Sequence, residues 1–208
     1  MIGHRPRVLF ARHGESTANL SRTFANRDDD RWPLTTAGIE QARELARSLT
    51  TEPPGRIFSS PLLRARETAQ VLASEFGTPW AVVETLREFD VGRWEGTKSE
   101  DGWAEYARAT EAWRCGDRDA RVGGGESLHD IVERFRPFVA TLIDSVADAG
   151  AMLCISHGGL YRAALPEFLE GVTREFATAE PFGHTAVVEA ELRGNRLVCL
   201  SWCGRVPS

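Results

Sequence analysis

Runs of apolar residues alternate along the chain with segments whose apolar residues recur at helical spacing. The short runs at residues 8–11, 56–59, 80–83 and 151–155 predict strands, and the continuously apolar ones are typical of strands covered on both faces. Apolar residues at helical spacing predict helices at residues 36–49, 61–73 and 127–146, and from residue 160 onward. Strands that alternate with helices in this way favour a mainly parallel sheet.

Capping residues set the expected ends of these helices. Thr35 or Thr36 is a suitable N-cap for the first helix. Pro61 suits the first turn of the second, because a proline there leaves no N–H unpaired. Ser127 and Asp130 have the spacing of a capping box, so the long helix is expected to begin directly after Ser127.

The last part of the chain has a different pattern. Residues 186–192 and 196–202 alternate polar and apolar side chains on either side of Gly194 and Asn195, which predicts a β-hairpin. Together the elements predict an α/β fold, a three-layer α/β/α sandwich with a mainly parallel central sheet and a C-terminal hairpin. No linker-like stretch divides the 208 residues, so we expect a single domain with a helical insertion at about residues 97–124.

Composition excludes several classes of protein. The chain has no apolar stretch near the roughly 20 residues of a membrane span and no signal-like N-terminal segment, so we expect a cytoplasmic protein that makes no membrane contact. A net charge of −5 and the absence of a basic run interleaved with aromatics argue against nucleic acid as a partner. The aspartates at residues 28–30 lack the spacing of a ligand set, and we expect neither a metal nor a cofactor.

Two histidines occupy equivalent places, each directly after a predicted strand. The first strand is followed by Arg12-His13-Gly14-Glu15-Ser16, and the strand at residues 151–155 by Ser156-His157-Gly158-Gly159. Because ligands of open α/β sheets bind beyond the carboxyl ends of the strands, both imidazoles are expected to face one pocket. A neutral imidazole is a competent nucleophile near pH 7, and the neighbouring guanidinium suits phosphate, so His13 is the candidate nucleophile of a phosphoryl transfer.

Further motifs extend this pattern along most of the chain. They are RHGESTAN at residues 12–19, LTTAGIEQA at 34–42, SSPLLRARETA at 59–69, LRE at 86–88, GRWEG at 92–96, GGES at 124–127 and SHGG at 156–159. In this order they resemble the histidine phosphatase superfamily, the phosphoglycerate-mutase-like clan, whose hallmark is Arg-His-Gly-Glu/Gln-Ser/Thr followed by an asparagine. The chain is most similar to the phosphatase branch of that family.

The resemblance implies that His13 is transiently phosphorylated and that Arg12, Arg64 and His157 bind the phosphoryl oxygens. Guanidinium groups donate bidentately to phosphate, and a protonated His157 would add positive charge without a metal. Asn19 would donate one further hydrogen bond to the phosphoryl group.

Glu88 matches the family's proton donor, which protonates the leaving alkoxide and later activates the hydrolytic water. Such an acid needs a raised pKa at pH 7, which burial or phosphate charge would provide, and a solvated loop carboxylate is the alternative interpretation. His184 falls near a small polar loop that borders the pocket in relatives, so it is a candidate substrate contact or a residue with no such role. Trp103, Tyr106 and Trp113 are interpreted as packing residues of the insertion.

The resemblance covers both phosphatases and cofactor-dependent mutases. Mutases resemble one another in an Arg-His-Tyr-Gly sequence after the acidic residue and in a longer, basic, proline-rich insertion. This chain has Phe89-Asp90-Val91-Gly92 instead, and residues 97–124 contain neither feature. We therefore expect a metal-independent phosphatase that hydrolyses a small phosphomonoester, a phosphorylated metabolite, through phosphohistidine.

Three alternatives remain open at this point. They are a phosphoglycerate-type mutase, a catalytically silent phospholigand-binding protein and a zinc hydrolase that uses His13, His157 and Glu88. Full activity in a strong chelator would exclude the zinc hydrolase. Substrate selectivity is expected in residues 21–32, 97–124 and 182–185, although the sequence identifies neither the phosphomonoester nor the oligomeric state, and a homodimer is compatible with it.

Overall fold

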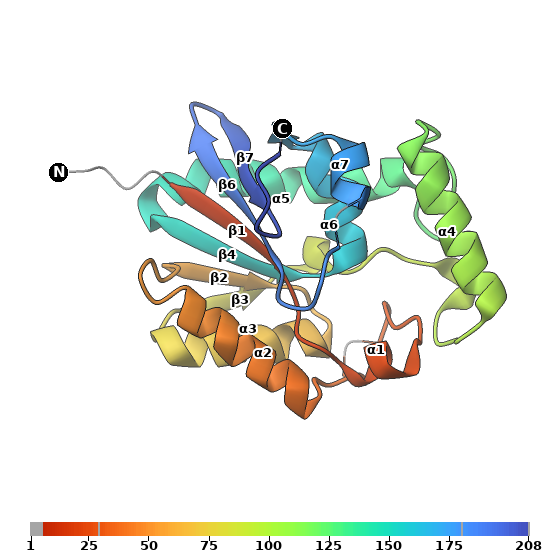
Figure 1. Cartoon of the computed structure of the whole chain (residues 1–208), viewed down its shortest axis with the longest axis horizontal. Coiled ribbons are helices and arrows are strands. Elements are labelled where there is room, and N and C mark those ends of the chain that lie inside the picture. The colour runs from red at the N-terminus through yellow and green to blue at the C-terminus, as the bar shows by residue number, and fades with distance from the viewer. Residues whose placement is uncertain (1–5, 29, 180, 208) are drawn as a thin grey trace.

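The computed structural model describes residues 6–28, 30–179 and 181–207. Its centre is a seven-stranded sheet with the strand order β3-β2-β4-β1-β6-β7-β5 (Figure 1). The strands are β1 (Arg7–Arg12), β2 (Arg56–Ser59), β3 (Trp80–Val82), β4 (Ala151–Ser156), β5 (Leu169–Glu170), β6 (Val187–Arg193) and β7 (Arg196–Trp202). Strands β3, β2, β4 and β1 are parallel, β6 runs antiparallel to β1, and β6 and β7 form a hairpin. The predicted α/β fold with a C-terminal hairpin is confirmed.

Helices cover both faces of this sheet. They are α1 (Thr17–Ser21), α2 (Thr36–Ser48), α3 (Leu63–Phe76), α4 (Glu100–Arg114), α5 (Leu128–Ala149), α6 (Gly158–Ala164) and α7 (Arg174–Ala179), with 3-10 turns at Glu84–Leu86, Gly92–Trp94 and Leu165–Glu167. Leu9 and Ala11 of β1 pack with α2 and α3, whereas Val8 and Phe10 belong to the larger cluster that includes α5 and α6. Because both faces of β1 are covered, its sequence is continuously apolar. Among the described residues, no helix is long and apolar enough to cross a membrane.

Two of the predicted helix starts are confirmed by their capping hydrogen bonds. Thr35 is the N-cap of α2, and its hydroxyl oxygen accepts the N–H of Gly38 at 3.0 Å. Ser127 is the N-cap of α5, where Ser127 Oγ accepts the N–H of Asp130 and the Asp130 carboxylate accepts the N–H of Ser127. These reciprocal bonds satisfy backbone donors that a helix start otherwise leaves unpaired.

The prediction that Pro61 lies in the first turn of a helix is wrong. Helix α3 begins at Leu63 with Leu62 as its N-cap, so Pro61 precedes the helix. The reason is that the chain is still attached to the sheet at Ser60, whose N–H donates to Ile155 O at 2.9 Å. The Ser60 hydroxyl then accepts the N–H of Leu62 at 3.3 Å, which stabilises a turn between β2 and α3.

Helix α4 lies to one side of the sheet, across from the segment that contains α1 (Figure 1). The loop after α1 is bound to the segment around α4 through its backbone, because Phe24 N–H donates to Thr97 O and Gly96 N–H donates to Phe24 O, both at 2.9 Å. The indole N–H of Trp103 donates to Arg22 O at 3.2 Å. The two segments therefore hold each other in a fixed position beside the ends of the strands.

Candidate active site

The ends of β1 and β4 bring the two histidines together, as their positions in the sequence predict. Arg12 and Ser156 are register partners at the carboxyl ends of these parallel strands, and His13 N–H donates to Ser156 O at 3.0 Å. The rings of His13 and His157 lie with their centroids 5.1 Å apart. Both side chains are buried, with 3% and 1% exposure respectively.

The turn after β1 is fixed by a close approach between two glycines. A Cβ at Gly14 would lie 2.4 Å from Gly38 O, and a Cβ at Gly38 would lie 2.0 Å from Glu15 O, so neither position has room for a side chain. Gly14 N–H also donates to Thr68 Oγ1 at 3.1 Å. Contacts from α2 and α3 thus determine where the backbone of His13 sits.

Hydrogen bonds define the tautomer of His13. Its Nδ1 lies 2.6 Å from Gly14 O, and because a carbonyl oxygen only accepts, Nδ1 carries the hydrogen. Nε2 accepts the Nε–H of Arg64 at 3.1 Å, so it carries the lone pair. Burial lowers the pKa of His13 well below its ordinary value, and the charges of Arg64 and Arg12 lower it further. His13 is therefore a neutral imidazole with Nε2 available as a nucleophile.

Arg64, in the first turn of α3, connects the two histidines. Its Nε donates to His13 as described, Nη1 donates to Ala25 O at 2.8 Å, and Nη2 donates to His157 Nδ1 at 3.3 Å. Burial lowers the pKa of Arg64 to about 10, at which the guanidinium is still charged at pH 7. This buried cation has neutral acceptors rather than a carboxylate as its hydrogen-bond partners, an arrangement suited to receiving an anion.

His157 is neutral in this arrangement, whereas the resemblance led us to expect a protonated His157 beside a bound phosphoryl group. Because Arg64 only donates, Nδ1 of His157 must accept, and Nε2 then carries the hydrogen and donates to Ser60 Oγ at 2.7 Å. Burial lowers the pKa of His157 well below its ordinary value, and Arg64 adds to this effect. The charge that the sequence interpretation assigned to His157 resides on the arginine beside it.

Arg12 contributes a second guanidinium to the same cavity. Its Nη1 donates to Phe182 O at 2.7 Å, which fixes the side chain, whereas its buried Nε has no hydrogen-bond partner among the described residues. Burial is the main reason that the pKa of Arg12 is lowered. A buried donor without a partner costs free energy, and an anion in the cavity would remove that cost.

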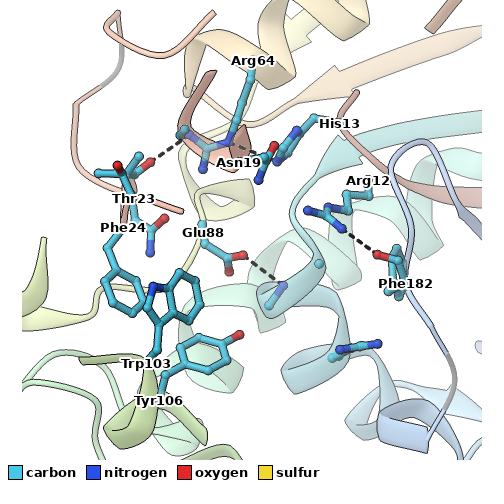
Figure 2. Close-up of a pocket in the computed structure, with 16 residues that line it drawn as sticks. Arg12, His13, Asn19, Thr23, Phe24, Arg64, Glu88, Trp103, Tyr106 and Phe182 are labelled. Atoms are coloured by element: carbon cyan, nitrogen blue, oxygen red, sulfur yellow. Dashed lines mark hydrogen bonds between the residues drawn. The ribbon is translucent and has the colours of Figure 1, made fainter. Parts of the chain in front are cut away.

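Glu88 is not a solvated loop carboxylate. Its Oε1 accepts the N–H of Phe89 at 3.0 Å. Its Oε2 accepts the N–H of Gly159 at 2.9 Å, the bond drawn from Glu88 in Figure 2. A Cβ at Gly159 would lie 2.7 Å from Glu88 Oε2, so the start of α6 can approach the carboxylate this closely only with glycine there. Burial raises the pKa of Glu88, although these N–H donors and Arg64 oppose the shift. The carboxyl group is therefore suited to exchange a proton inside the cavity.

Asn19 and His184 differ in their relation to this cavity. Asn19 lines it, and because its Oδ1 accepts from both the N–H and the hydroxyl of Ser16, its amide N–H groups remain for a ligand. The ring of His184 lies 6.2 Å from that of His13, but His184 does not line the cavity. Its buried Nε2 has no hydrogen-bond partner in the described part of the chain, and burial followed by Arg12 lowers its pKa to about 4.

The cavity has a volume of about 310 Å³, which is at the small end for a ligand site. Of the residues predicted from the sequence, Arg12, His13, Asn19, Arg64 and Glu88 line it (Figure 2). His157 does not line the cavity, and its ring nitrogens bond to Ser60 and Arg64 instead.

The sequence interpretation missed several other lining residues, which include Phe24, Trp103, Tyr106 and Arg162. The helical spacing of Trp103 and Tyr106 can be seen in the sequence, but it is as typical of residues that pack a helix against its neighbours as of residues that bind a ligand. Arg162 had no special context in a chain rich in arginine.

The structure describes two residues of the acidic run at residues 28–30. Asp28 and Asp30 are described, and Asp30 pairs with Arg66, whereas Asp29 lies outside the described residues. Within the described ranges, no group of three or more His, Cys, Asp or Glu side chains is placed to hold a metal ion. The cations that surround the cavity are guanidinium groups.

The neutral histidines predict a pH-dependent stability. In the unfolded chain His13 and His157 gain protons below about pH 6.5, whereas in the folded protein their lowered pKa keeps them neutral. The stability they contribute is complete above about pH 6.5 and is lost as the pH falls toward their folded pKa values. Over that window the free energy of unfolding should fall by up to about 1.4 kcal/mol per pH unit for each histidine, as measured by urea unfolding.

Single variants separate the contributions to this pH dependence. His13→Ala should remove the contribution of one histidine to the pH dependence of the free energy of unfolding. His129→Ala, which replaces an exposed histidine, should leave that dependence unchanged. Glu88, whose pKa is raised, offsets part of the loss only below its own folded pKa, where the folded carboxyl keeps a proton that the unfolded one releases. A free energy of unfolding that stays constant from about pH 8 to about pH 5 would contradict the neutral, buried histidines.

Comparison with known proteins gives these residues a family context. The family model of the histidine phosphatase superfamily (branch 1) matches residues 8–204. A 2,3-bisphosphoglycerate-dependent phosphoglycerate mutase of Methylobacterium radiotolerans is 35% identical over 174 residues, which cover 80% of this chain and 80% of the relative. A glucosyl-3-phosphoglycerate phosphatase of Mycolicibacterium vanbaalenii is 36% identical over 175 residues, which cover 80% of this chain and 75% of the relative.

The fold is shared with solved structures of such phosphatases. The structure of the mycobacterial glucosyl-3-phosphoglycerate phosphatase in complex with VO3 has a TM-score of 0.80 and 28% sequence identity, and the match covers 95% of this chain and 98% of that chain. Relatives of this chain thus include both phosphatases and phosphoglycerate mutases. From the family match over nearly its whole length, the chain belongs to the histidine phosphatase superfamily, branch 1.

Proposed function

We propose that this protein is a metal-independent phosphatase that hydrolyses a small phosphomonoester through a phosphohistidine intermediate on His13. The observation that carries the proposal is the tautomer of His13, whose Nδ1–H is held by Gly14 O at 2.6 Å so that Nε2 keeps its lone pair. Two guanidinium groups, those of Arg12 and Arg64, and the carboxyl group of Glu88 line the same cavity. A nucleophile, cations for the phosphoryl oxygens and an acid are the groups that phosphoryl transfer requires.

The first step transfers the phosphoryl group to the histidine. Arg64 turns its Nε–H from His13 to the phosphoryl oxygens, which frees Nε2 of His13, and Arg12 offers its Nε–H to the same group. Nε2 attacks phosphorus, a P–N bond forms, and the P–O bond to the alcohol breaks. The leaving oxygen takes the proton of Glu88, whose raised pKa favours the protonated form.

The second step reverses the role of the acid. Glu88, now a carboxylate, accepts a proton from a water molecule that attacks the phosphorus of phosphohistidine. The P–N bond breaks, inorganic phosphate is released, and His13 returns to its neutral form. Asn19 donates to the phosphoryl group in both steps, and His157 positions Arg64 through the bond at its Nδ1. His184, whose ring lies 6.2 Å from that of His13, does not line the cavity, so we assign it no direct contact with the substrate.

Hydrolysis is favoured over the mutase and binding alternatives by particular residues. One side of the cavity is formed by Phe24, Trp103 and Tyr106, whose rings are poor partners for the second phosphate or carboxylate that a phosphoglycerate mutase must hold. Besides Arg12 and Arg64, Arg162 is the one further cation among the described lining residues for such a group. A catalytically silent binding protein would have no need of a buried, neutral imidazole opposite an acid with a raised pKa. The substrate we propose is therefore a small phosphorylated metabolite, with no macromolecular partner.

A panel of phosphomonoesters tests the proposed function. Phosphate release is measured with sugar phosphates, nucleotides, an aryl phosphate, 3-phosphoglycerate, glucosyl-3-phosphoglycerate and α-ribazole 5′-phosphate, with and without a strong chelator. We expect release of inorganic phosphate from one or more of them at a rate that the chelator leaves unchanged, because guanidinium groups supply the positive charge.

Each alternative gives a different result in this assay. A mutase interconverts 2- and 3-phosphoglycerate in the presence of 2,3-bisphosphoglycerate faster than it releases phosphate. A zinc hydrolase loses its activity in the chelator, and a silent binding protein releases no phosphate from any compound. Any of these results would contradict the proposal.

A further inference from the structure

Three aromatic side chains form a continuous surface on one side of the cavity, which we call the aromatic wall: Phe24, Trp103 and Tyr106. The rings of Phe24 and Trp103 are stacked, with centroids 4.1 Å apart and an interplanar angle of 24°. Tyr106 lies 5.6 Å from Trp103 and 6.2 Å from Phe24 between ring centroids. The wall combines two segments that are distant in sequence, the loop after α1 and helix α4.

The aromatic wall is held in place by contacts outside the cavity. Trp103 is fixed by its indole bond to Arg22 O, and Phe24 by the hydrogen bonds of its own backbone N–H and C=O to Thr97 and Gly96. Tyr106 stacks on the buried ring of Phe89, at 5.5 Å between centroids and 19° between planes. A rigid apolar surface that still lines a cavity binds a ligand without first paying for its own ordering.

The line of phosphoryl transfer points the leaving group toward this wall. Attacking and leaving atoms lie on opposite sides of the phosphorus, so an alcohol displaced by His13 Nε2 departs on the side away from His13. In Figure 2 the carboxyl group of Glu88 lies between His13 and the rings of Trp103 and Tyr106. An oxygen that receives its proton from Glu88 therefore has the rest of its alcohol directed to the aromatic wall.

We propose that the aromatic wall binds a ring in the alcohol portion of the substrate. The substrate class is a phosphomonoester whose alcohol carries an aromatic or sugar ring within a few bonds of the ester oxygen. Both kinds of ring present a flat C–H or π face that packs on indole and phenyl rings, and a cavity of about 310 Å³ limits the alcohol to a small one. This inference rests on the proposed phosphatase function and adds the selectivity of its site.

The test compares alkyl phosphates whose alcohols have similar acidity and differ in the ring. Benzyl phosphate and cyclohexylmethyl phosphate carry one, and propyl phosphate does not. We expect kcat/KM of the wild-type protein to be about tenfold or more higher for the ring compounds, which is the discrimination that a well-packed apolar surface provides. The kcat/KM values for glucose 6-phosphate and glycerol 3-phosphate give the same comparison for a sugar ring.

Variants locate the selectivity on the wall. In Trp103→Leu the ratio of kcat/KM for benzyl over propyl phosphate should fall about tenfold. Trp103→Phe, which keeps a ring but loses the N–H bond to Arg22, should keep most of the ratio. Trp80→Leu is the matched control, because Trp80 is also partly buried against the core but lies on the edge strand β3, outside the cavity. Tyr106→Leu is a second test in case Trp103→Leu does not fold.

The outcomes separate this inference from the proposed function. Equal kcat/KM values for ring and acyclic phosphates in the wild-type protein, with phosphate released from both, would overturn the inference and leave the phosphatase proposal standing. If the ratio of kcat/KM for benzyl over propyl phosphate is as high in Trp103→Leu and Tyr106→Leu as in Trp80→Leu, the selectivity lies elsewhere and the inference is also overturned. Release of no phosphate from any compound would overturn the phosphatase proposal, and the inference with it.

Discussion

Replacing His13 by alanine is expected to lower kcat for phosphate release by about 10⁴-fold or more, because no other side chain in the cavity can take its place as nucleophile. The other polar side chains among the described lining residues are arginines, a carboxylate, amides and the hydroxyls of Thr23 and Tyr106, none of which is as nucleophilic near pH 7 as a neutral imidazole. The fold should persist, since the turn after β1 is held by the contacts of Gly14 with Gly38 and Thr68 rather than by the imidazole.

The measurement is the rate of phosphate release together with the phosphorylation state of the protein. Wild-type protein stopped during turnover should carry one acid-labile, alkali-stable phosphate, and His13→Ala should carry none. His129→Ala, at an exposed position, is the control and should behave as the wild type does. If His13→Ala retained turnover or the labile phosphate, another residue would be the nucleophile and the proposed mechanism would be wrong.

Replacing Glu88 by glutamine is expected to give the second largest loss, and the loss should depend on the alcohol. An alkyl alkoxide is strongly basic and needs the proton of Glu88 as it leaves, so kcat for an alkyl phosphate should fall about 10²- to 10⁴-fold. An activated aryl leaving group needs little protonation, and the fall in its first step should be much smaller. Glutamine preserves the shape of the side chain and can still accept the N–H of Gly159 through its carbonyl oxygen.

The pH dependence of the rate provides an independent check on Glu88. Because burial raises its pKa, the wild-type rate for alkyl phosphates should decline as the pH rises through that raised value, and Glu88→Gln should lack this decline. Glu84→Gln is the control, since Glu84 is an exposed carboxylate four residues earlier that pairs with Arg87. Equal losses for alkyl and aryl phosphates, measured in the step that forms phosphohistidine, would remove Glu88 from the role of acid.

The main elements of the fold were predictable because their patterns are local. The continuously apolar run of β1 follows from its burial on both faces, and the hairpin of β6 and β7 follows from the turn at Gly194. Strand β5 and helices α1 and α7 were not predicted. They have two, five and six residues, too few to show a period, and they form where the packed chain supports them.

The identities of the site residues could be predicted from the sequence, whereas their protonation states could not. Placing His13 and His157 at strand ends was enough to bring them together, since parallel strands end at one edge of a sheet. The neutral form of His157 could not be predicted from the sequence, because it depends on Arg64. Helix α3 brings Arg64, 93 positions away in the chain, to 3.3 Å between its Nη2 and His157 Nδ1. The aromatic wall was missed for a related reason, because Trp103 stacks on Phe24 from another segment.

The contacts between the loop after α1 and the segment around α4 have a consequence for how selectivity can diverge among relatives. Because Trp103 of α4 donates to Arg22 O and stacks on Phe24, a chimera that exchanges α4 alone would leave that carbonyl and that ring without their partner. The two segments are therefore expected to change together during evolution, as one exchangeable unit. The histidines and arginines at the strand ends, which rest on the sheet and on α3, can stay constant while that unit is replaced.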